Sequence, residues 1–154
     1  MRVRDYMTTS VTTLSDEARL LDAALLIRRT GKRHVPILST DGKVVGIISD
    51  RDVSRLAPSM LAQMTPEDYN RVFEATPITV AMTKNPMIVS PDAPVAEAVA
   101  LLYTKKIGAL LAVENGTLVG ILTVNDMLGL LNELLTGSQT SSEASTLEKP
   151  ARKP

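Results

Sequence analysis

The 154-residue chain contains no cysteine and no tryptophan, and it has a single histidine. The absence of cysteine excludes disulfides and thiolate chemistry, and one histidine excludes a histidine-rich metal site. Aromatic residues make up only 3% of the chain, so the core must be aliphatic, and a stacking surface for single-stranded nucleic acid is not expected. The sequence also lacks a Gly-x-Ser-x-Gly nucleophile elbow and a Walker loop. Together these absences argue against an enzyme.

Excess charge and long apolar runs are missing too. Seventeen Lys and Arg balance seventeen Asp and Glu, which gives a formal net charge of zero. Nucleic acids and anionic membranes bind basic surfaces, so neither partner is expected. No apolar run approaches the ~20 residues that cross a bilayer, and no apolar signal core follows the charged first residues. We therefore expect a cytoplasmic protein, with one domain of ordinary size.

What the chain does contain is a repeat. Residues 46–52 read Gly-Ile-Ile-Ser-Asp-Arg-Asp and residues 120–126 read Gly-Ile-Leu-Thr-Val-Asn-Asp, and both fit Gly-apolar-apolar-[Ser/Thr]-x-x-Asp. Upstream, Met7-Thr8 recurs as Met82-Thr83. The spacing is 74 residues for the first pair and 75 for the second, and the difference falls in a turn that is shorter in the second copy. A duplication whose length difference lies in a loop indicates two copies of one supersecondary unit.

Each copy predicts the order strand, helix, strand, strand, helix. In the first copy we expect strands over 11–14, 34–38 and 43–48, a helix from about residue 20 to Gly31, and a second helix from Ser49. In the second copy we expect strands over 87–89, 110–113 and 117–122, a helix that begins near Pro94, and a last helix over 123–135. The chain is thus predicted to be an α+β protein, with two pseudo-symmetric β-α-β-β-α repeats packed sheet to sheet.

The domain limits follow from the same pattern. The repeats are expected over residues 1–60 and 80–135, joined by a linker over 61–79. Within the linker, Thr65-Pro66-Glu67-Asp68 is a capping box that predicts a short helix to Phe73 or Ala75. Residues 136–154 are rich in Ser, Thr, Glu, Lys and Pro, so we expect a disordered tail, because such a segment buries too little apolar surface to offset its ordering entropy.

The repeated motif has two interpretations that the sequence leaves open. In one, the Ser or Thr caps the following helix and the Asp lies favourably in its first turn. In the other, a ligand binds there, because a helix N-terminus beside a strand end attracts phosphate or ribose groups, and a carboxylate accepts hydrogen bonds from two vicinal hydroxyls. The repeated glycine marks a point where something approaches the backbone closely. Capping and ligand binding are compatible.

On these motifs the sequence resembles a tandem pair of CBS (cystathionine-β-synthase) domains, often called a Bateman module, over roughly residues 1–135. Residues 34–37 also match the strand pattern x-apolar-Pro-apolar of that family. The resemblance implies that the pair binds an adenosine-containing ligand between its copies: AMP, ADP, ATP, S-adenosylmethionine or a dinucleotide. It also implies that pairs dimerise into a flat disc of four copies.

The resemblance assigns residues to two sites. In the family, the motif Asp binds ribose hydroxyls, the motif Ser or Thr faces phosphate or ribose, and basic residues two and three places before the strand proline meet the phosphates. The first site is then expected to comprise Arg33, His34, Ile47, Ser49, Arg51 and Asp52, with a base pocket of Thr83, Ile88, Gly108 and Ala109. Arginine suits forked phosphate contacts, and Lys32 adds charge nearby. The cations at 32–34 are open to a second interpretation, as a solvated helix end.

The second site is expected to comprise Thr8, Thr13, Ile121, Thr123, Asn125 and Asp126. Its phosphate positions, Gly108 and Ala109, carry no charge, and Leu111 stands in place of the family's proline. We therefore expect this site to be the weaker one, either empty or filled by a ligand with little phosphate. Lys105 and Lys106 lie close in sequence and offer partial compensation.

The leading hypothesis is a regulatory module that senses an adenine nucleotide and acts on another protein through a change in its homodimer. No catalytic cofactor and no metal are expected. The alternative is a structural homodimerisation module, in which the motifs only cap helices and no nucleotide is physiological. The apolar residues of the last helix, such as Leu128, Leu130, Leu131, Leu134 and Leu135, suit an isologous interface.

Overall fold

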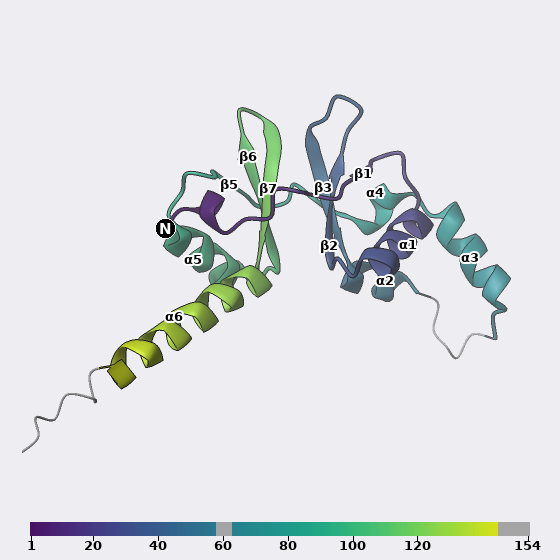
Figure 1. The fold of residues 1–154 in the computed structure, drawn as a ribbon. Coiled ribbons are helices and arrows are strands. Elements are labelled where there is room, and N and C mark those ends of the chain that lie inside the picture. The colour runs from purple at the N-terminus through teal and green to yellow at the C-terminus, as the bar shows by residue number, and fades with distance from the viewer. Residues whose placement is uncertain (58–62, 145–154) are drawn as a thin grey trace, which may run out of the picture.

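The computed structural model describes residues 1–57 and 63–144, and it shows two similar halves side by side (Figure 1). The first half contains β1 (Leu14–Ser15), α1 (Leu20–Thr30), β2 (His34–Leu38), β3 (Val44–Ser49) and α2 (Asp50–Leu56). The second contains β5 (Ile88–Val89), α5 (Val95–Lys105), β6 (Ala109–Glu114), β7 (Thr117–Thr123) and α6 (Val124–Ala144). The predicted α+β class and the order of elements in each repeat are therefore confirmed.

Several short elements lie outside the repeated order. They are a 3₁₀ turn, η1 (Val3–Asp5), then α3 (Pro66–Ala75), α4 (Ile78–Ala81) and β4 (Thr83–Lys84). The linker helix α3 begins as predicted, because the Thr65 side chain accepts a hydrogen bond from the Asp68 N–H and Pro66 stands at the first helical position. The first strand is shorter than expected and lies later, at Leu14–Ser15 rather than 11–14.

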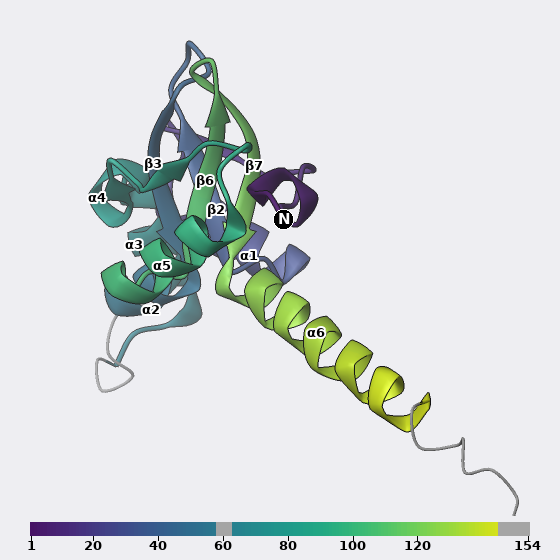
Figure 2. The same ribbon diagram turned by 90° about the vertical axis from the view of Figure 1, so that its left-hand side faces the viewer.

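The expectation of a disordered tail from residue 136 is wrong for residues 136–144. They continue α6, which projects from the body in both views (Figures 1 and 2). Thr136 supports this extension by donating from its hydroxyl to the Asn132 carbonyl at 2.8 Å. Lengthening an existing helix costs far less than nucleating one, so a polar composition does not end it at once. The rest of the predicted tail, residues 145–154, lies outside the described residues.

Each repeat builds one sheet around an antiparallel hairpin. The first sheet has the order β1-β2-β3-β4 and the second the order β5-β6-β7, and β1 and β5 run parallel to their neighbours. In both hairpins the register shifts once, between Ile37 and Leu38 in the first and between Ala112 and Val113 in the second. The two hairpins rise together with their turns at the same end (Figures 1 and 2).

The repeats exchange their opening segments. Thr83 of β4 pairs with Ile47 in the first sheet, although β4 opens the second repeat. In return, Thr8 forms two backbone hydrogen bonds with Ile121 in the second sheet, of 2.9 and 3.0 Å. A Cβ at Gly46 would lie 2.4 Å from the Met82 sulfur, and a Cβ at Gly120 would lie 2.5 Å from the Met7 sulfur. The close approach marked by the repeated glycine is therefore made by the repeated methionine of the other copy.

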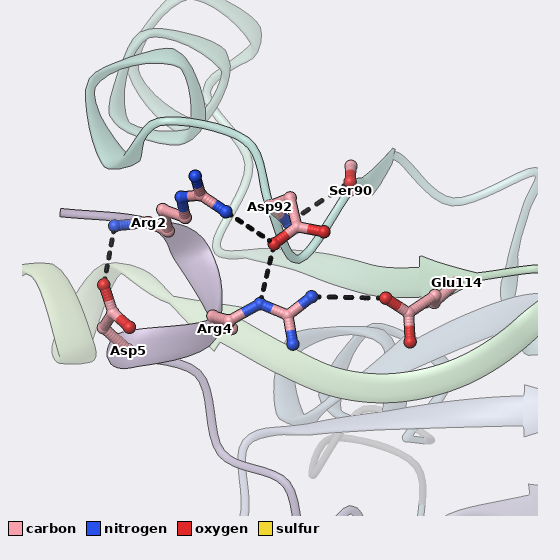
Figure 3. A network of polar contacts seen from close by, with 6 residues as sticks. All are labelled: Arg2, Arg4, Asp5, Ser90, Asp92 and Glu114. Carbon is pink, nitrogen blue, oxygen red and sulfur yellow. Dashed lines mark hydrogen bonds and ion pairs between the residues drawn. The ribbon is translucent and has the colours of Figure 1, made fainter.

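The N-terminal segment is fastened to the second repeat. The Arg4 guanidinium binds Asp92 at 2.8 Å and Glu114 at 3.2 Å, and Arg2 binds Asp92 at 3.1 Å (Figure 3). The hydrogen bond from Arg4 lowers the pKa of Asp92 below its usual value. Val3 between the two arginines is buried in the core of the second repeat. These contacts fix the path that carries Thr8 to β7.

Three apolar clusters form the core. One lies within each repeat, between its sheet and its helices. The third joins the repeats: Ala109, Leu111 and Ile121 of the second sheet pack with Val44 and Ile47 of the first. The predicted packing of sheet on sheet is confirmed by this third cluster.

Candidate functional site

A cleft of about 720 Å³ opens between the repeats where β3 and β7 end and α2 and α6 begin. Each helix start is held beside the entry to a hairpin by the same backbone bond: Asp50 N–H donates to the Arg33 carbonyl, and Val124 N–H donates to the Gly108 carbonyl, both at 3.0 Å. Duplicated sequence thus produces two helix N-termini at one opening. Helix N-termini carry partial positive charge and unpaired N–H groups, which favour anions.

The cleft contains residues from both expected sites. Of the first set it is lined by Arg33, His34, Ser49, Arg51 and Gly108. Of the second set it is lined by Thr8, Ile121, Thr123, Asn125 and Asp126. Sequence reasoning placed these ten residues in two separate sites, whereas the structure brings them to one cavity.

The other predicted residues do not line this cleft. Ile47 and Ala109 pack in the cluster that joins the sheets, and Asp52 is only 8% exposed. Thr83 is exposed on β4, and Ile88 is 56% exposed on β5. Thr13, from the second set, is half-buried. The base pocket expected for the first site therefore remains a prediction.

The cleft is also lined by residues that belong to neither predicted site. They are Gly31, Lys32, Asp50, Lys106, Ile107, Val124 and Leu128. Lys32 and Lys106 had been noted only as nearby charge. Lys106 occupies the left-handed C-cap of α5, with φ 53° and ψ 43°, where α1 ends with Gly31 in a similar conformation. Gly31 and Lys106 are 75 residues apart, as are Met7 and Met82, and this repeat spacing is the sequence signal that would have placed both helix ends at the cleft.

Both repeated motifs cap their helices. The Ser49 N–H and hydroxyl donate to Asp52 Oδ2 at 2.8 and 2.9 Å. The Thr123 N–H and hydroxyl donate to Asp126 Oδ2 at 2.7 and 2.8 Å. In each case the hydroxyl oxygen also accepts the N–H of the aspartate, at 3.3 Å. The capping interpretation is therefore correct for both motifs, and it uses one carboxylate oxygen of each aspartate.

The second carboxylate oxygen differs between the motifs. Asp52 Oδ1 faces the Arg55 guanidinium at 3.5 Å. Position 129, which corresponds to Arg55, is a glycine. Among the described side chains, those of residues 1–57 and 63–137, Asp126 Oδ1 has no hydrogen-bond or ion-pair partner. A carboxylate oxygen at a cavity with no protein partner can accept hydrogen bonds from a ligand.

Positive charge gathers in the cleft although the whole chain is neutral. Lys32, Arg33, Arg51 and Lys106 line it against Asp50 and Asp126, an excess of two positive charges. Arg33 is paired with Asp50 at 3.2 Å. Across the described parts of the chain, Lys32, Arg51 and Lys106 have no carboxylate within ion-pair distance. These three cations are available to an anionic ligand.

His34 contributes little charge at neutral pH. Burial lowers the pKa of the imidazole below its ordinary value, because a charged ring is costly to desolvate, and the Asp50 carboxylate only partly opposes this. The neutral ring can donate or accept a hydrogen bond.

Metal and membrane sites find no support in the part of the chain that the structure describes. Among the side chains of residues 1–57 and 63–137 there is no cluster of three or more His, Asp or Glu placed to hold a metal ion. Over the same residues, no helix has both the length and the apolar character of a membrane span.

The profile of the CBS domain matches residues 3–59 and 77–133, which correspond to the two structural repeats. The chain belongs to the CBS domain family. Among solved structures, a candidate acetoin utilization protein (AcuB) from Vibrio cholerae is 32% identical, with a TM-score of 0.71 and coverage of 97% of this chain and 98% of that chain.

Two further relatives share this similarity. The CBS domain pair of protein MJ0100, solved in complex with 5′-methylthioadenosine and S-adenosyl-L-methionine, is 25% identical, with a TM-score of 0.71 and coverage of 86% and 96% of the two chains. The A-adding tRNA nucleotidyltransferase of Aquifex aeolicus is 31% identical over 133 residues, which are 86% of this chain and 15% of that enzyme. The chain therefore spans only a small part of this enzyme relative.

Proposed function

We propose that the chain is a regulatory module that binds an adenosine-containing ligand in the cleft between its repeats. The observation that carries this proposal is the presence in one cavity of an excess of positive charge and of a carboxylate oxygen, Asp126 Oδ1, with no partner among the described side chains. A ribose offers two vicinal hydroxyls to the carboxylate, and phosphates offer negative charge to the cations. The MJ0100 pair, which holds two adenosine ligands, supports the choice of adenosine.

AMP, ADP or ATP suits this cleft better than an uncharged nucleoside, because Lys32, Arg51 and Lys106 lack acidic partners among the described residues. S-adenosylmethionine carries no phosphate, and its single carboxylate is outweighed by its own ammonium and sulfonium charges, so it would neutralise these cations poorly. No catalytic role is proposed, because the Ser49 and Thr123 hydroxyls of the cleft donate to Asp52 and Asp126 and serve as helix caps. The ligand would act by binding two shapes of the protein with different affinity, and so shift the balance between them toward a regulated partner protein.

A thermal-shift and calorimetry panel tests this proposal on the full chain. The ligands are adenosine, AMP, ADP, ATP and S-adenosylmethionine, with GTP as the control for the base. A ligand at 100 times its dissociation constant should stabilise the fold by about 2.7 kcal/mol. Saturable binding of at least one adenine nucleotide at micromolar concentration supports the proposal, and an unchanged melting temperature with all five ligands refutes it.

A structural dimerisation module is the second candidate, and one observation favours it. Exposed apolar side chains follow one face of α6 at positions 124, 128, 131 and 135, and an apolar groove of about 700 Å³ lies between α5 and α6. Spacings of three and four residues place these side chains on one stripe. An exposed apolar stripe of this kind is typical of an interface between copies. Val124 and Leu128 of this stripe also line the cleft, whereas positions 131 and 135 do not, so a dimer formed through positions 131 and 135 is compatible with nucleotide binding.

A further inference from the structure

The two motif aspartates lie in different surroundings although their motifs repeat. Asp52 is 8% exposed, its Oδ2 accepts both hydrogen bonds of Ser49, and its Oδ1 faces Arg55. Asp126 is half-buried at the cleft wall and makes the same contacts through Oδ2 only. The equivalent positions three places after the aspartates also differ, because α2 has Arg55 there and α6 has Gly129.

We infer that the chain binds one nucleotide, with the ribose on Asp126 and the phosphates on cations that the first repeat and Lys106 supply, and that Arg55 closes the equivalent position at Asp52. This inference rests on the proposed function and specifies its stoichiometry and its preferred ligand class, an adenosine polyphosphate. It reverses the order of strength expected from the sequence, in which the second motif was the weaker site.

The phosphate side of this site crosses the boundary between the repeats. Gly108 and Ala109, the phosphate positions of the second copy, carry no charge, but Lys32 and Arg51 of the first copy line the same cavity as Asp126. Lys106 adds a third cation from the second copy. Charge that the second repeat lacks is therefore supplied by the first.

The cleft volume agrees with one ligand. About 720 Å³ falls within the range of roughly 300–1,000 Å³ that is usual for a pocket holding one small molecule. Each additional phosphate adds negative charge beside three cations that have no carboxylate partner in the described residues. Affinity should therefore rise in the order adenosine, AMP, ADP, ATP.

The experiment is isothermal titration of the full chain with ATP and AMP, using variants at two equivalent positions. Gly129→Arg places a guanidinium beside Asp126, as Arg55 stands beside Asp52, and should weaken ATP binding at least tenfold. Gly129→Ala is the matched control, because a Cβ at this position meets nothing within 4 Å, and it should stay within twofold of the parent chain. Asp126→Asn should weaken ATP binding at least tenfold, and Asp52→Asn less than threefold.

The remaining outcomes separate this inference from the proposed function. One ATP per chain, bound at least tenfold more tightly than AMP, supports the inference. Two nucleotides per chain, equal losses in Asp52→Asn and Asp126→Asn, or equal affinity for AMP and ATP would overturn it while nucleotide binding itself stands. Absence of binding by every adenosine ligand refutes the proposed function. Circular dichroism of each variant identifies any loss that comes from unfolding, and Gly129→Ala and Gly129→Arg remain informative if an aspartate variant fails to fold.

Discussion

The imidazole of His34 fills the space that a side chain on Gly108 would occupy. A Cβ built on Gly108 would lie 2.5 Å from Nε2 and 2.8 Å from Cε1 of His34. His34 begins β2 in the first repeat, and Gly108 directly precedes β6 in the second, so this contact lies across the boundary between the repeats, and both residues line the cleft. The absence of a side chain at 108 is thus what allows the only histidine of the chain to stand there.

Gly108→Ala should lower the free energy of unfolding by about 1–3 kcal/mol, because the added methyl group overlaps the ring. In a His34→Ala background the same change should cost less than about 0.5 kcal/mol, since the ring is gone. Urea denaturation of the parent, both single variants and the double variant measures this coupling. Strictly additive effects would show that the two residues are not in contact.

The free energy of unfolding of the protein without ligand should decrease as the pH is lowered below the ordinary pKa of histidine, and His34 is the cause. The pKa of the folded imidazole lies below the value of about 6.5 expected for the unfolded chain, so the unfolded state binds the proton more readily. The stabilisation that depends on a neutral His34 is therefore fully present above pH 6.5 and is lost as the pH falls below that value. His34→Gln should reduce the slope of the urea midpoint between pH 8 and pH 5.

The two carboxyl groups with shifted pKa values do not interfere in that window. The pKa values of Asp41 and Asp92 are lowered from 3.8, so their contributions persist above pH 3.8 and are lost only in more acidic solution. A slope that is the same in the parent chain and in His34→Gln would mean that the ring titrates normally in the folded protein.

The repeated pattern was sufficient to predict the fold, because both copies have the same order of elements and because Ser49 and Thr123 cap the equivalent helices. The exchange of opening segments was not predictable from it. The glycine signal at 46 and 120 showed that something approaches the backbone, but spacing along the chain does not tell on which repeat Met7 or Met82 packs. Only the folded topology brings Met82 to Gly46 and Met7 to Gly120.

The candidate site was predictable in its residue types and less so in its grouping. Within its own repeat the second motif has uncharged residues, Gly108 and Ala109, at the phosphate positions. In the structure the repeats face each other, and Lys32 and Arg51 stand at the same opening as Asp126. The ion pair between Asp52 and Arg55 could have been predicted from the sequence, because residues three positions apart are neighbours on the surface of a helix.

Gly120→Ala should destabilise the fold by about 1–3 kcal/mol, because the new methyl group would overlap the Met7 side chain within the sheet. Met7→Ala should relieve most of this cost, since the nearest three atoms all belong to Met7. Gly46→Ala should be relieved less by Met82→Ala, because the Thr83 carbonyl oxygen also lies 3.0 Å from the added carbon. Thermal denaturation of the four variants and the two double variants compares the relief directly.

Leu131→Glu and Leu135→Glu together should shift the protein toward the monomer. These side chains are 50% and 59% exposed on the α6 stripe, and charge placed on an apolar interface must be desolvated when two copies meet. Sedimentation equilibrium at several concentrations measures the change, with Thr136→Glu as the control, because position 136 is neither three nor four residues from any member of the stripe. Because neither leucine lines the cleft, ATP affinity should be unaffected. A parent chain that is monomeric at all concentrations contradicts dimerisation by this face.

Lys106→Gly should stabilise the fold and weaken nucleotide binding at the same time. Lys106 holds the left-handed C-cap of α5 with φ 53°, a conformation that disfavours side chains bearing a Cβ, and α1 uses Gly31 at the corresponding place. Glycine there should raise the free energy of unfolding by up to about 1 kcal/mol. The same change removes a cleft cation, so the affinity for ATP should fall at least threefold while the affinity for adenosine stays constant.

Lys105→Gly is the control for the loss of a positive charge, since Lys105 lies within the last turn of α5 and outside the cleft lining. This variant should lower the free energy of unfolding and leave the affinity for ATP unchanged. If Lys106→Gly gains stability without losing ATP affinity, Lys106 does not meet the phosphates; if it loses affinity for adenosine and ATP equally, the lysine acts on the shape of the cleft rather than through its charge.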